Sequence, residues 1–333
     1  FWFFCLGLYI LTFGLAFLET AANPYALTMG NKETATQRLN LAQAFNPVGL
    51  IVGLFIAQQF VLKNLKSDDV ENFRALNEAS KVLIRTSDLM VIRNPYVILG
   101  LILIVVFVVF LVSKMPQGKD EGGMPKIGES FAILSKNKKY VLGVLAQIFH
   151  TGCLIMCWTY IYQYAEAIGI DNVTAGYYQM TAFILFTIGR AVGTYLLRFI
   201  SSGKLLMYFA ILGIIFTTGA IFIHGTIGLY SLVGISFSMS LMFPTIYGMA
   251  LGDLTEEQSK LGSAGLIMSI VGGALMPKLQ ALIIDIGGNG VDDIIIFGVP
   301  EINFSFILPM ICFTYIGWYG LRGYKKHELI TTL

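Results

Sequence analysis

The stretch FWFFCLGLYILTFGLAFLETAANPYALTMG at residues 1–30 is the strongest indication of the fold, because it is long and apolar enough to cross a lipid bilayer. After a polar turn at 31–38, a second apolar run, LNLAQAFNPVGLIVGLFIAQQFVL, follows at 39–62. A backbone inside a bilayer must satisfy its own hydrogen bonds, so both runs are expected to be helices. The two runs therefore predict a transmembrane hairpin.

The first run contains a carboxylate, Glu19, well inside the expected helix. About 11 helical residues, or ~16 Å, separate it from the turn, which is roughly half of a ~30 Å hydrocarbon core. Asn46 on the returning helix is expected at a similar depth, and Gln43 shares its face because the two are three residues apart. An ionisable group near the membrane midplane is costly, so these residues predict a functional site.

The composition is that of an integral membrane protein. Of the 333 residues, 56% are hydrophobic and 13% are charged, whereas soluble domains carry about 25% charged residues. The net charge of +2 gives no indication of a partner. The alternating segments of about ten residues that build membrane β-barrels do not occur in the sequence. We predict an all-α fold, a polytopic helical bundle in a cell membrane.

About nine apolar runs are expected to span the membrane. They lie at 2–29, 39–62, 94–113, 139–166, 173–199, 204–223, 226–252, 261–286 and 302–323. The charged stretch 63–93 separates the second run from the third, and a stretch rich in Lys, Gly and Pro separates the third from the fourth. We predict a partial N-terminal transmembrane half at 1–113, a linker at 114–138 and a C-terminal transmembrane half at 139–333.

The distribution of Lys and Arg predicts the orientation, since these residues are enriched in cytoplasmic loops. If the turn at 31–38 is cytoplasmic, the linker, the turns at 199–205 and 253–260 and the C-terminus lie on the same side. That side then carries most of the basic residues, and the opposite side carries them in the stretch 63–93. The linker is therefore predicted to be cytoplasmic.

Several function classes are disfavoured. The three histidines are widely spread and form no HExxH pair, and no Walker loop is present, which argues against a membrane enzyme or an ATP-driven pump. The sequence contains no repeated segment that could form a selectivity filter, which argues against a channel. Cys153 and Cys157 lie one helical turn apart and could in principle bind a metal, but their apolar surroundings favour a packing role. We predict no metal, no cofactor and no nucleic-acid partner.

Six stretches carry motifs that occur together in one transporter family. They are LETAANPY (18–25), LNLAQAFNP (39–47), CWTYIYQYA (157–165), FTIGRAVGTYLLRF (186–199), FPTIYGMAL (243–251) and GSAGLIMSIVGGALMP (262–277). In these motifs the chain resembles the fucose–galactose–glucose:proton symporter family, a branch of the major facilitator superfamily. The resemblance covers essentially the whole chain, in order. It implies two halves of six helices, so three helices are expected upstream of residue 1, and residues 1–333 alone are not expected to transport.

The resemblance also implies roles for individual residues. Glu19 matches the acid that takes up and releases the coupling proton, and Gln43 and Asn46 match amides that contact sugar hydroxyls. Trp158 matches an aromatic residue facing the central cavity. Fucose-type members have an amide at about the position of Leu154 and a tyrosine near His150, so the identity of the sugar stays open. The family's other membrane carboxylate, on its first helix, has no counterpart in this sequence.

A neutral sugar is bound by hydrogen-bonding amides and aromatic rings. The residues predicted to offer this chemistry are Gln43, Asn46, Gln147, Trp158, Tyr160 and Gln163. A buried amide without a partner is costly. The alternatives are that the amides join helices and that the aromatic residues form an interfacial belt.

Arg190 is expected near the cytoplasmic end of the fifth run, where a snorkelling or helix-capping role near the inner gate is favoured over sugar contact. Pro24, Pro47 and Pro244 lie inside apolar runs and are expected to kink them. The pair Asn23-Pro24 is expected to free a backbone carbonyl one turn back, near Glu19.

Together these features predict a secondary active transporter that imports a neutral monosaccharide, L-fucose or a related hexose, coupled to proton entry by alternating access. The alternatives are an uncoupled sugar facilitator and a sensor built on a transporter fold. The expected partners are the monosaccharide, the proton and the lipid bilayer, and the expected form is a monomer in a bacterial inner membrane. Proton occupancy of Glu19 is expected to change the hydrogen bonding around Gln43 and Asn46.

Overall fold

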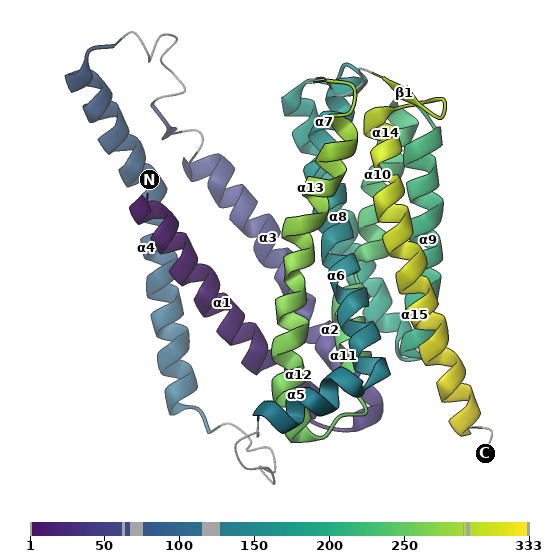
Figure 1. Cartoon of the computed structure of the whole chain (residues 1–333). Coiled ribbons are helices and arrows are strands. Elements are labelled where there is room, and N and C mark those ends of the chain that lie inside the picture. Colours follow the sequence, from purple (N-terminus) through teal and green to yellow (C-terminus); the bar gives the residue numbers. More distant parts are fainter. Residues whose placement is uncertain are drawn as a thin grey trace. The chain divides into compact units, whose positions relative to one another are not determined.

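The computed structural model describes residues 2–61, 64–66, 76–114, 127–288, 290 and 294–331, and helices dominate it (Figure 1). Within the described residues, 8 helical segments are long and apolar enough to cross a membrane. α8 is as long as its neighbours, with 25 residues, but Gln, Tyr, Thr and Arg lower its hydropathy and it is not among them. The predicted fold class, an all-α polytopic membrane bundle, is confirmed.

The first part of the chain holds the elements that were expected as three spans. They are α1 (Trp2–Thr28), the 3-10 turn η1 (Lys32–Thr34), α2 (Ala35–Gln43), α3 (Phe45–Ile56), the π-helical turn η2 (Ala57–Val61) and α4 (Glu78–Val112).

The later elements cover the remaining spans. They are α5 (Ile127–Lys136), α6 (Lys138–Thr159), α7 (Ile161–Ala167), α8 (Asn172–Leu196), α9 (Ser202–Phe222), α10 (Thr226–Met239), α11 (Met242–Leu251), α12 (Glu256–Met268), η5 (Ser269–Val271), α13 (Gly272–Ile284), α14 (Glu301–Ser305) and α15 (Ile307–Thr331). A short antiparallel hairpin pairs β1 (Ile295–Ile296) with β2 (Val299–Pro300), with Ile295 opposite Pro300.

The chain forms two compact units, Phe1–Pro47 with Asp120–Leu333, and Val48–Lys119. The second unit contains most of α3 and all of α4. α4 begins well before the apolar run expected at 94–113, because Asn77 caps it by accepting a hydrogen bond from the Ser80 amide at 2.8 Å. Part of the charged stretch 63–93 is therefore helix, which an apolar pattern cannot reveal.

α5 lies in the sequence expected as the linker, of which residues 115–126 are outside the described part. The side chains of Ser130 and Leu134 are buried while Phe131 and Ile133 are exposed, and α5 packs against α6 and α12. The polar composition of 114–138 indicated a loop and did not reveal this helix. The division into halves at 1–113 and 139–333 stays a prediction.

Several spans of the first unit are broken in the middle, and prolines account for two of the breaks. α2 gives way to α3 at Ala44, just before Pro47, and α10 gives way to α11 just before Pro244. Proline has no N–H, so the carbonyl four residues before it loses its helical partner. The released carbonyls belong to Gln43 and Ser240.

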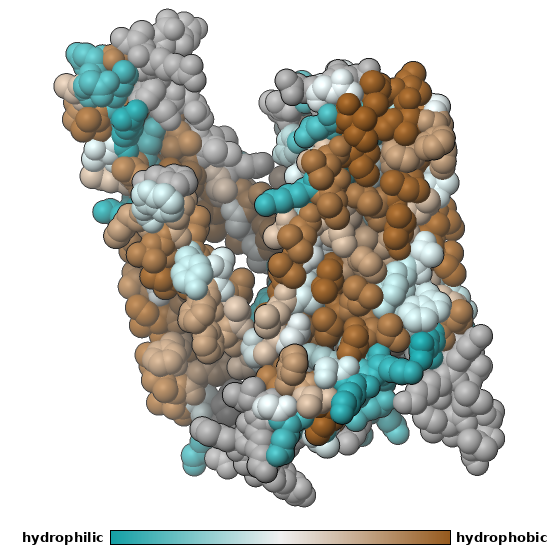
Figure 2. Space-filling model, viewed as in Figure 1, coloured by the Kyte–Doolittle hydropathy of each residue, from teal (hydrophilic) through white to brown (hydrophobic). Residues whose placement is uncertain are grey.

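Helix packing in the predicted C-terminal half is close where glycine meets backbone. Gly272 at the start of α13 lies directly against the Ile148 carbonyl of α6, a contact that leaves no room for a Cβ atom. Figure 2 shows apolar residues over most of the visible sides of the helices and hydrophilic residues gathered toward their ends. This distribution fits helices whose outer faces meet lipid.

An apolar cluster joins the first two helices to the predicted C-terminal half. It contains Leu39, Leu134, Tyr140, Tyr247, Ala250, Leu251, Leu266 and Ile267, with Ala16, Ala26 and Leu27 packed against it. These residues lie at the end of the first unit where α1 ends, α2 begins and α11 meets α12, which we call the turn end. The turn end is the side predicted to be cytoplasmic.

Candidate functional site

Glu19 lies on α1, and its side chain is half-buried. Within the part of the chain that the structure describes, its carboxylate has neither an ion-pair partner nor a hydrogen bond. α1 packs against α2 and α12 in this region. The acid is therefore partly withdrawn from solvent without a cation to neutralise it.

Asn23 and Gln43 connect α1 to α2 beside this acid. The Gln43 Nε2 donates to Asn23 Oδ1 at 3.1 Å, and Asn23 is only 7% exposed. Asn23 follows Glu19 by one helical turn, so the two side chains share a face. The Asn23 Nδ2 is buried and has no partner among the described residues. The structure thus joins Asn23 to Gln43 one helical turn after Glu19.

Asn46 differs from Gln43 in its surroundings. The helix breaks between them at Ala44, and Asn46 is exposed while Gln43 is half-buried. We expected the two amides to share one face of a continuous helix. The helix is instead interrupted between them, and Pro47 causes the interruption. The hydrogen-bonding groups of Asn46 remain accessible.

Pro24 releases a backbone carbonyl next to the acid. The residue four before it is Thr20, whose carbonyl loses its helical N–H partner. That carbonyl accepts a hydrogen bond from the Ser263 Oγ of α12 at 3.0 Å. A carbonyl directly after Glu19 is therefore satisfied by a side chain distant in the sequence.

Arg190 binds both of the other released carbonyls. Its Nη1 donates to the Gln43 carbonyl at 3.0 Å and its Nε donates to the Ser240 carbonyl at 2.6 Å. The side chain is 4% exposed, and its guanidinium carbon lies 4.8 Å from the centre of the Phe186 ring. α2 and α10 both end here, and their C-terminal carbonyls carry partial negative charge. This is the geometry that a helix-capping role requires.

α6 carries two buried polar residues with unused hydrogen-bonding groups. Gln147 is 0% exposed, and neither of its amide atoms has a partner among the described residues. His150 lies one turn further on; its Nδ1 is also unpartnered within that part of the chain, and its ring is 6.3 Å from Phe243 of α11. Such groups are costly unless water or a ligand satisfies them.

A family model described as Major Facilitator Superfamily matches residues 1–286. This chain belongs to the major facilitator superfamily. The L-fucose-proton symporter of Haemophilus influenzae is 49% identical over 329 residues, which are 97% of this chain and 75% of that protein. The glucose/galactose transporter of Brucella abortus is 30% identical over 324 residues, which are 96% of this chain and 71% of that protein.

Solved structures agree with this membership. The fucose:proton symporter FucP of Escherichia coli aligns with a TM-score of 0.86 at 27% identity, covering 96% of this chain and 76% of that one. FucP in the outward conformation aligns with a TM-score of 0.85. The resemblance to the fucose–galactose–glucose:proton symporter family is confirmed, and the protein is a multi-pass membrane transporter of the major facilitator superfamily and not an enzyme.

In this member of the superfamily, Trp158 packs among aromatic residues of α8. Its ring lies 4.7 Å from Phe183 and 5.2 Å from Phe186, edge to face. Its Nε1 donates to the Ser236 Oγ of α10 at 3.1 Å. The indole N–H is thus satisfied within the protein, and the partly exposed ring is what it can offer to a ligand.

Tyr160 and Gln163 lie beyond the end of α6. The Tyr160 hydroxyl donates to the Pro277 carbonyl of α13 at 2.9 Å, and the side chain is 8% exposed. Gln163 is half-buried, and its Oε1 has no partner among the described residues. Tyr160 therefore joins two helices, while Gln163 keeps an acceptor unused. The contacts described for these two residues do not place either of them beside Glu19.

The sequence did not identify the hydroxyl groups that surround the site. The Tyr247 hydroxyl of α11 lies 2.6 Å from the Ser263 Oγ, and the Asn40 Nδ2 of α2 donates to the Thr245 Oγ1 of α11 at 3.2 Å. Ser263 and Thr245 are of types common in membrane helices, and the spacing of the four residues carries no signal of a long-range pair. The one indication of these contacts in the sequence was that a tyrosine, Tyr247, lies within an apolar run.

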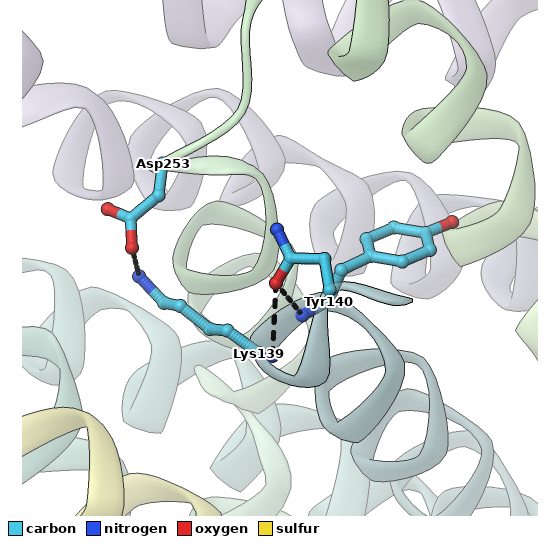
Figure 3. Close-up of polar contacts among 4 residues, drawn as sticks. Lys139, Tyr140 and Asp253 are labelled. Carbon is cyan, nitrogen blue, oxygen red and sulfur yellow. Dashed lines mark hydrogen bonds and ion pairs between the residues drawn. The ribbon is translucent and has the colours of Figure 1, made fainter. Parts of the chain in front are cut away.

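Contacts at the turn end hold α6 against α12 and the residues just before α12, and Figure 3 draws the Lys139–Asp253 pair and the cap of α6. The Asn137 side chain caps α6 by accepting from the Lys139 and Tyr140 amides at 3.1 and 3.2 Å. The Lys139 Nζ pairs with the Asp253 Oδ2 at 2.9 Å, and the Tyr140 hydroxyl donates to the Gly262 carbonyl at 2.9 Å. Gly262 is therefore held against α6, and this contact fixes the position of the next residue, Ser263.

Proposed function

We propose that this transporter imports L-fucose, or a closely related hexose, together with a proton by alternating access. The relatives named for L-fucose-proton symport and for glucose or galactose transport support this substrate class. The geometry that supports proton coupling is the position of Glu19, a half-buried acid without a cation among the described residues. An acid that is not held by an ion pair is free to take up and release a proton.

Glu19 is proposed to carry the proton, and the amides around it are proposed to bind the sugar. Gln43 lies against Asn23 next to Glu19, so a change of charge on the acid alters the field at the amide pair. Asn46, Gln147 and Gln163 have polar groups that no described residue satisfies or that are exposed. For Trp158 and Tyr160 the proposed contribution is the ring surface, because their polar hydrogens are used by the protein.

Uptake into proteoliposomes tests the proposal, with the protein expressed together with any helices that its gene encodes before residue 1. Labelled L-fucose is expected to accumulate above its external concentration when the outside is made acidic, and unlabelled galactose and glucose are tested as competitors. Equilibration without accumulation would indicate an uncoupled facilitator, and absence of uptake would indicate a sensor. Accumulation that requires an acidic exterior supports symport.

The variant Glu19→Gln separates coupling from binding. It is expected to abolish accumulation driven by a pH gradient while sparing exchange of internal for external sugar, because an amide cannot release a proton at any physiological pH. Glu166→Gln, which replaces an exposed acid on α7, is the matched control and is expected to accumulate sugar normally. Loss of exchange in Glu19→Gln would instead assign the acid a structural role.

A further inference from the structure

Ser236 on α10 is a buried serine whose hydroxyl binds the side chain of another helix. Its Oγ accepts from the Trp158 Nε1 of α6 at 3.1 Å, and the residue is 1% exposed. A hydroxyl in a membrane helix commonly donates to the carbonyl one turn back, as Ser231 of the same helix does toward Ile227 at 3.0 Å. Among the described residues, Trp158 is instead the one hydrogen-bond partner of the Ser236 side chain.

Three contacts hold the Trp158 indole. Besides the bond to Ser236, the ring lies 4.7 Å from Phe183 and 5.2 Å from Phe186 of α8, edge to face. The two ring contacts limit where the indole can lie, but the hydrogen bond is directional and decides which edge of the indole meets α10. Because Trp158 is half-buried, Ser236 thereby decides which part of the ring stays uncovered.

Short contacts also connect this ring to Gln43. Phe186 contacts both Trp158 and Arg190, whose guanidinium carbon is 4.8 Å from the centre of the Phe186 ring. The Arg190 Nη1 in turn donates to the Gln43 carbonyl at 3.0 Å. Trp158 and Gln43, two residues proposed to bind one sugar, are thus tied to the same pair of residues. A sugar that contacts both of them requires the indole in a defined position relative to the amide.

We propose that Ser236 is a positioning residue for sugar binding, which acts by holding the Trp158 ring in the orientation that a neutral sugar meets. The negative face of an aromatic ring attracts the weakly positive C–H groups of a sugar, so the orientation of the ring sets the strength of the contact. The hydroxyl does not itself touch the sugar, because it is buried and its oxygen is used by the indole. The inference rests on the proposed sugar-binding function and adds to it a residue outside the six motifs.

Binding and exchange are measured on the protein expressed together with any helices that its gene encodes before residue 1. Ser236→Ala is expected to weaken L-fucose binding about tenfold in titration calorimetry, because the indole loses its acceptor. The KM for L-fucose exchange in vesicles is expected to rise by the same factor while the maximal rate stays unchanged, since the ring contributes to binding alone.

A variant whose sole tryptophan is Trp158, with phenylalanine at every other tryptophan position, reports on the ring directly. Its fluorescence anisotropy is expected to decay faster after Ser236→Ala, because the ring then moves within its site. Ser238→Ala is the matched control: Ser238 is 0% exposed on the same helix, and its Oγ has no partner among the described residues. Two residues along a helix it lies on nearly the opposite side, so it is expected to change neither the affinity nor the decay.

Trp158→Phe removes the indole N–H and keeps an aromatic ring. It is expected to weaken L-fucose binding by itself, and adding Ser236→Ala to it is expected to cost no further affinity. The inference is overturned by normal binding in Ser236→Ala, by an equal loss in Ser238→Ala, or by a Ser236→Ala loss that is as large in the Trp158→Phe background as alone. Failure of the unmodified protein to bind L-fucose would overturn the proposed function instead.

Discussion

At the scale of single residues, one connected set of polar groups begins at Asn23, one helical turn after the acid on α1. Asn23 accepts from the Gln43 amide, and the Gln43 carbonyl accepts from Arg190. Gln43 therefore takes part through its side chain and its backbone at once. Its side chain is the member of the set most directly suited to a sugar hydroxyl, because an amide both donates and accepts.

Gln43→Ala is expected to weaken L-fucose binding about tenfold, since the loss of one or two hydrogen bonds is worth about 1.4 kcal/mol. Titration calorimetry on the purified protein measures this change. Gln37→Ala alters a half-buried glutamine of the same helix outside the proposed site and is expected to bind normally. Equal affinities for both variants would remove Gln43 from the binding site.

At the scale of elements, a carbonyl that a proline releases from its helix accepts a hydrogen bond from a side chain of another helix. Pro47 and Pro244 release the carbonyls of Gln43 and Ser240, and Arg190 satisfies both. The planar guanidinium presents several donors in a fixed fork, so it can serve two helix ends at once. The breaks in α2–α3 and α10–α11 are thereby tied to one residue of α8.

Arg190→Lys is expected to destabilise the folded protein by about 1–3 kcal/mol, because a single ammonium group cannot replace both donors and leaves a buried carbonyl unsatisfied. Thermal unfolding in detergent measures the loss as a lower Tm. Arg198→Lys, at an exposed arginine just beyond α8, is expected to unfold like the unmodified protein.

The prolines supply a second check on this pairing. In a Pro47→Ala, Pro244→Ala background the backbone regains the two missing N–H donors. Arg190→Lys is then expected to cost less stability than it does alone. An equal cost in both backgrounds would show that the arginine stabilises the protein by some other contact.

At the scale of the whole first unit, contacts concentrate where α1 and α2 meet α11 and α12. Hydrogen bonds there include Ser263 to Thr20 and Asn40 to Thr245, and the apolar cluster around Leu39 fills the same end. The Thr36 side chain lies close to α11 at Gly248, where an added Cβ would lie 2.8 Å from the Thr36 Oγ1. The turn end is closed in this structure.

Gly248→Val is expected to shift the protein toward conformations in which the turn end is open, because the larger side chain cannot fit against Thr36. A cysteine at Leu39, a position that is 0% exposed, would then react faster with a thiol reagent in a background lacking Cys5. Gly176→Val, on α8 where an added Cβ meets only the Tyr162 hydroxyl at 3.6 Å, is expected to leave the rate unchanged. An unchanged rate in Gly248→Val would show that this contact does not control closure.

The membrane-helix fold and the chemistry available in each helix follow from the amino-acid sequence alone. Apolar length, proline positions and an acid inside an apolar run are local properties, so the sequence is enough to single out Glu19, Gln43 and Arg190. It is not enough for the hydroxyl groups of Tyr247 and Ser263, because a serine in an apolar helix has the same local pattern whether or not it meets a distant carbonyl. The same limit concealed the helical start of α4 and the whole of α5, whose order depends on a cap or on packing against other helices.

Which donor reaches which released carbonyl is settled by the packing of the helices. Pro24 and Pro47 ensure by covalent structure that Thr20 and Gln43 lose their helical partners. That Ser263 and Arg190 replace those partners depends on how α1 and α2 pack against α12 and α8. A released carbonyl buried without a donor costs free energy, so the packing that supplies one is favoured, and no local pattern in the sequence encodes that packing.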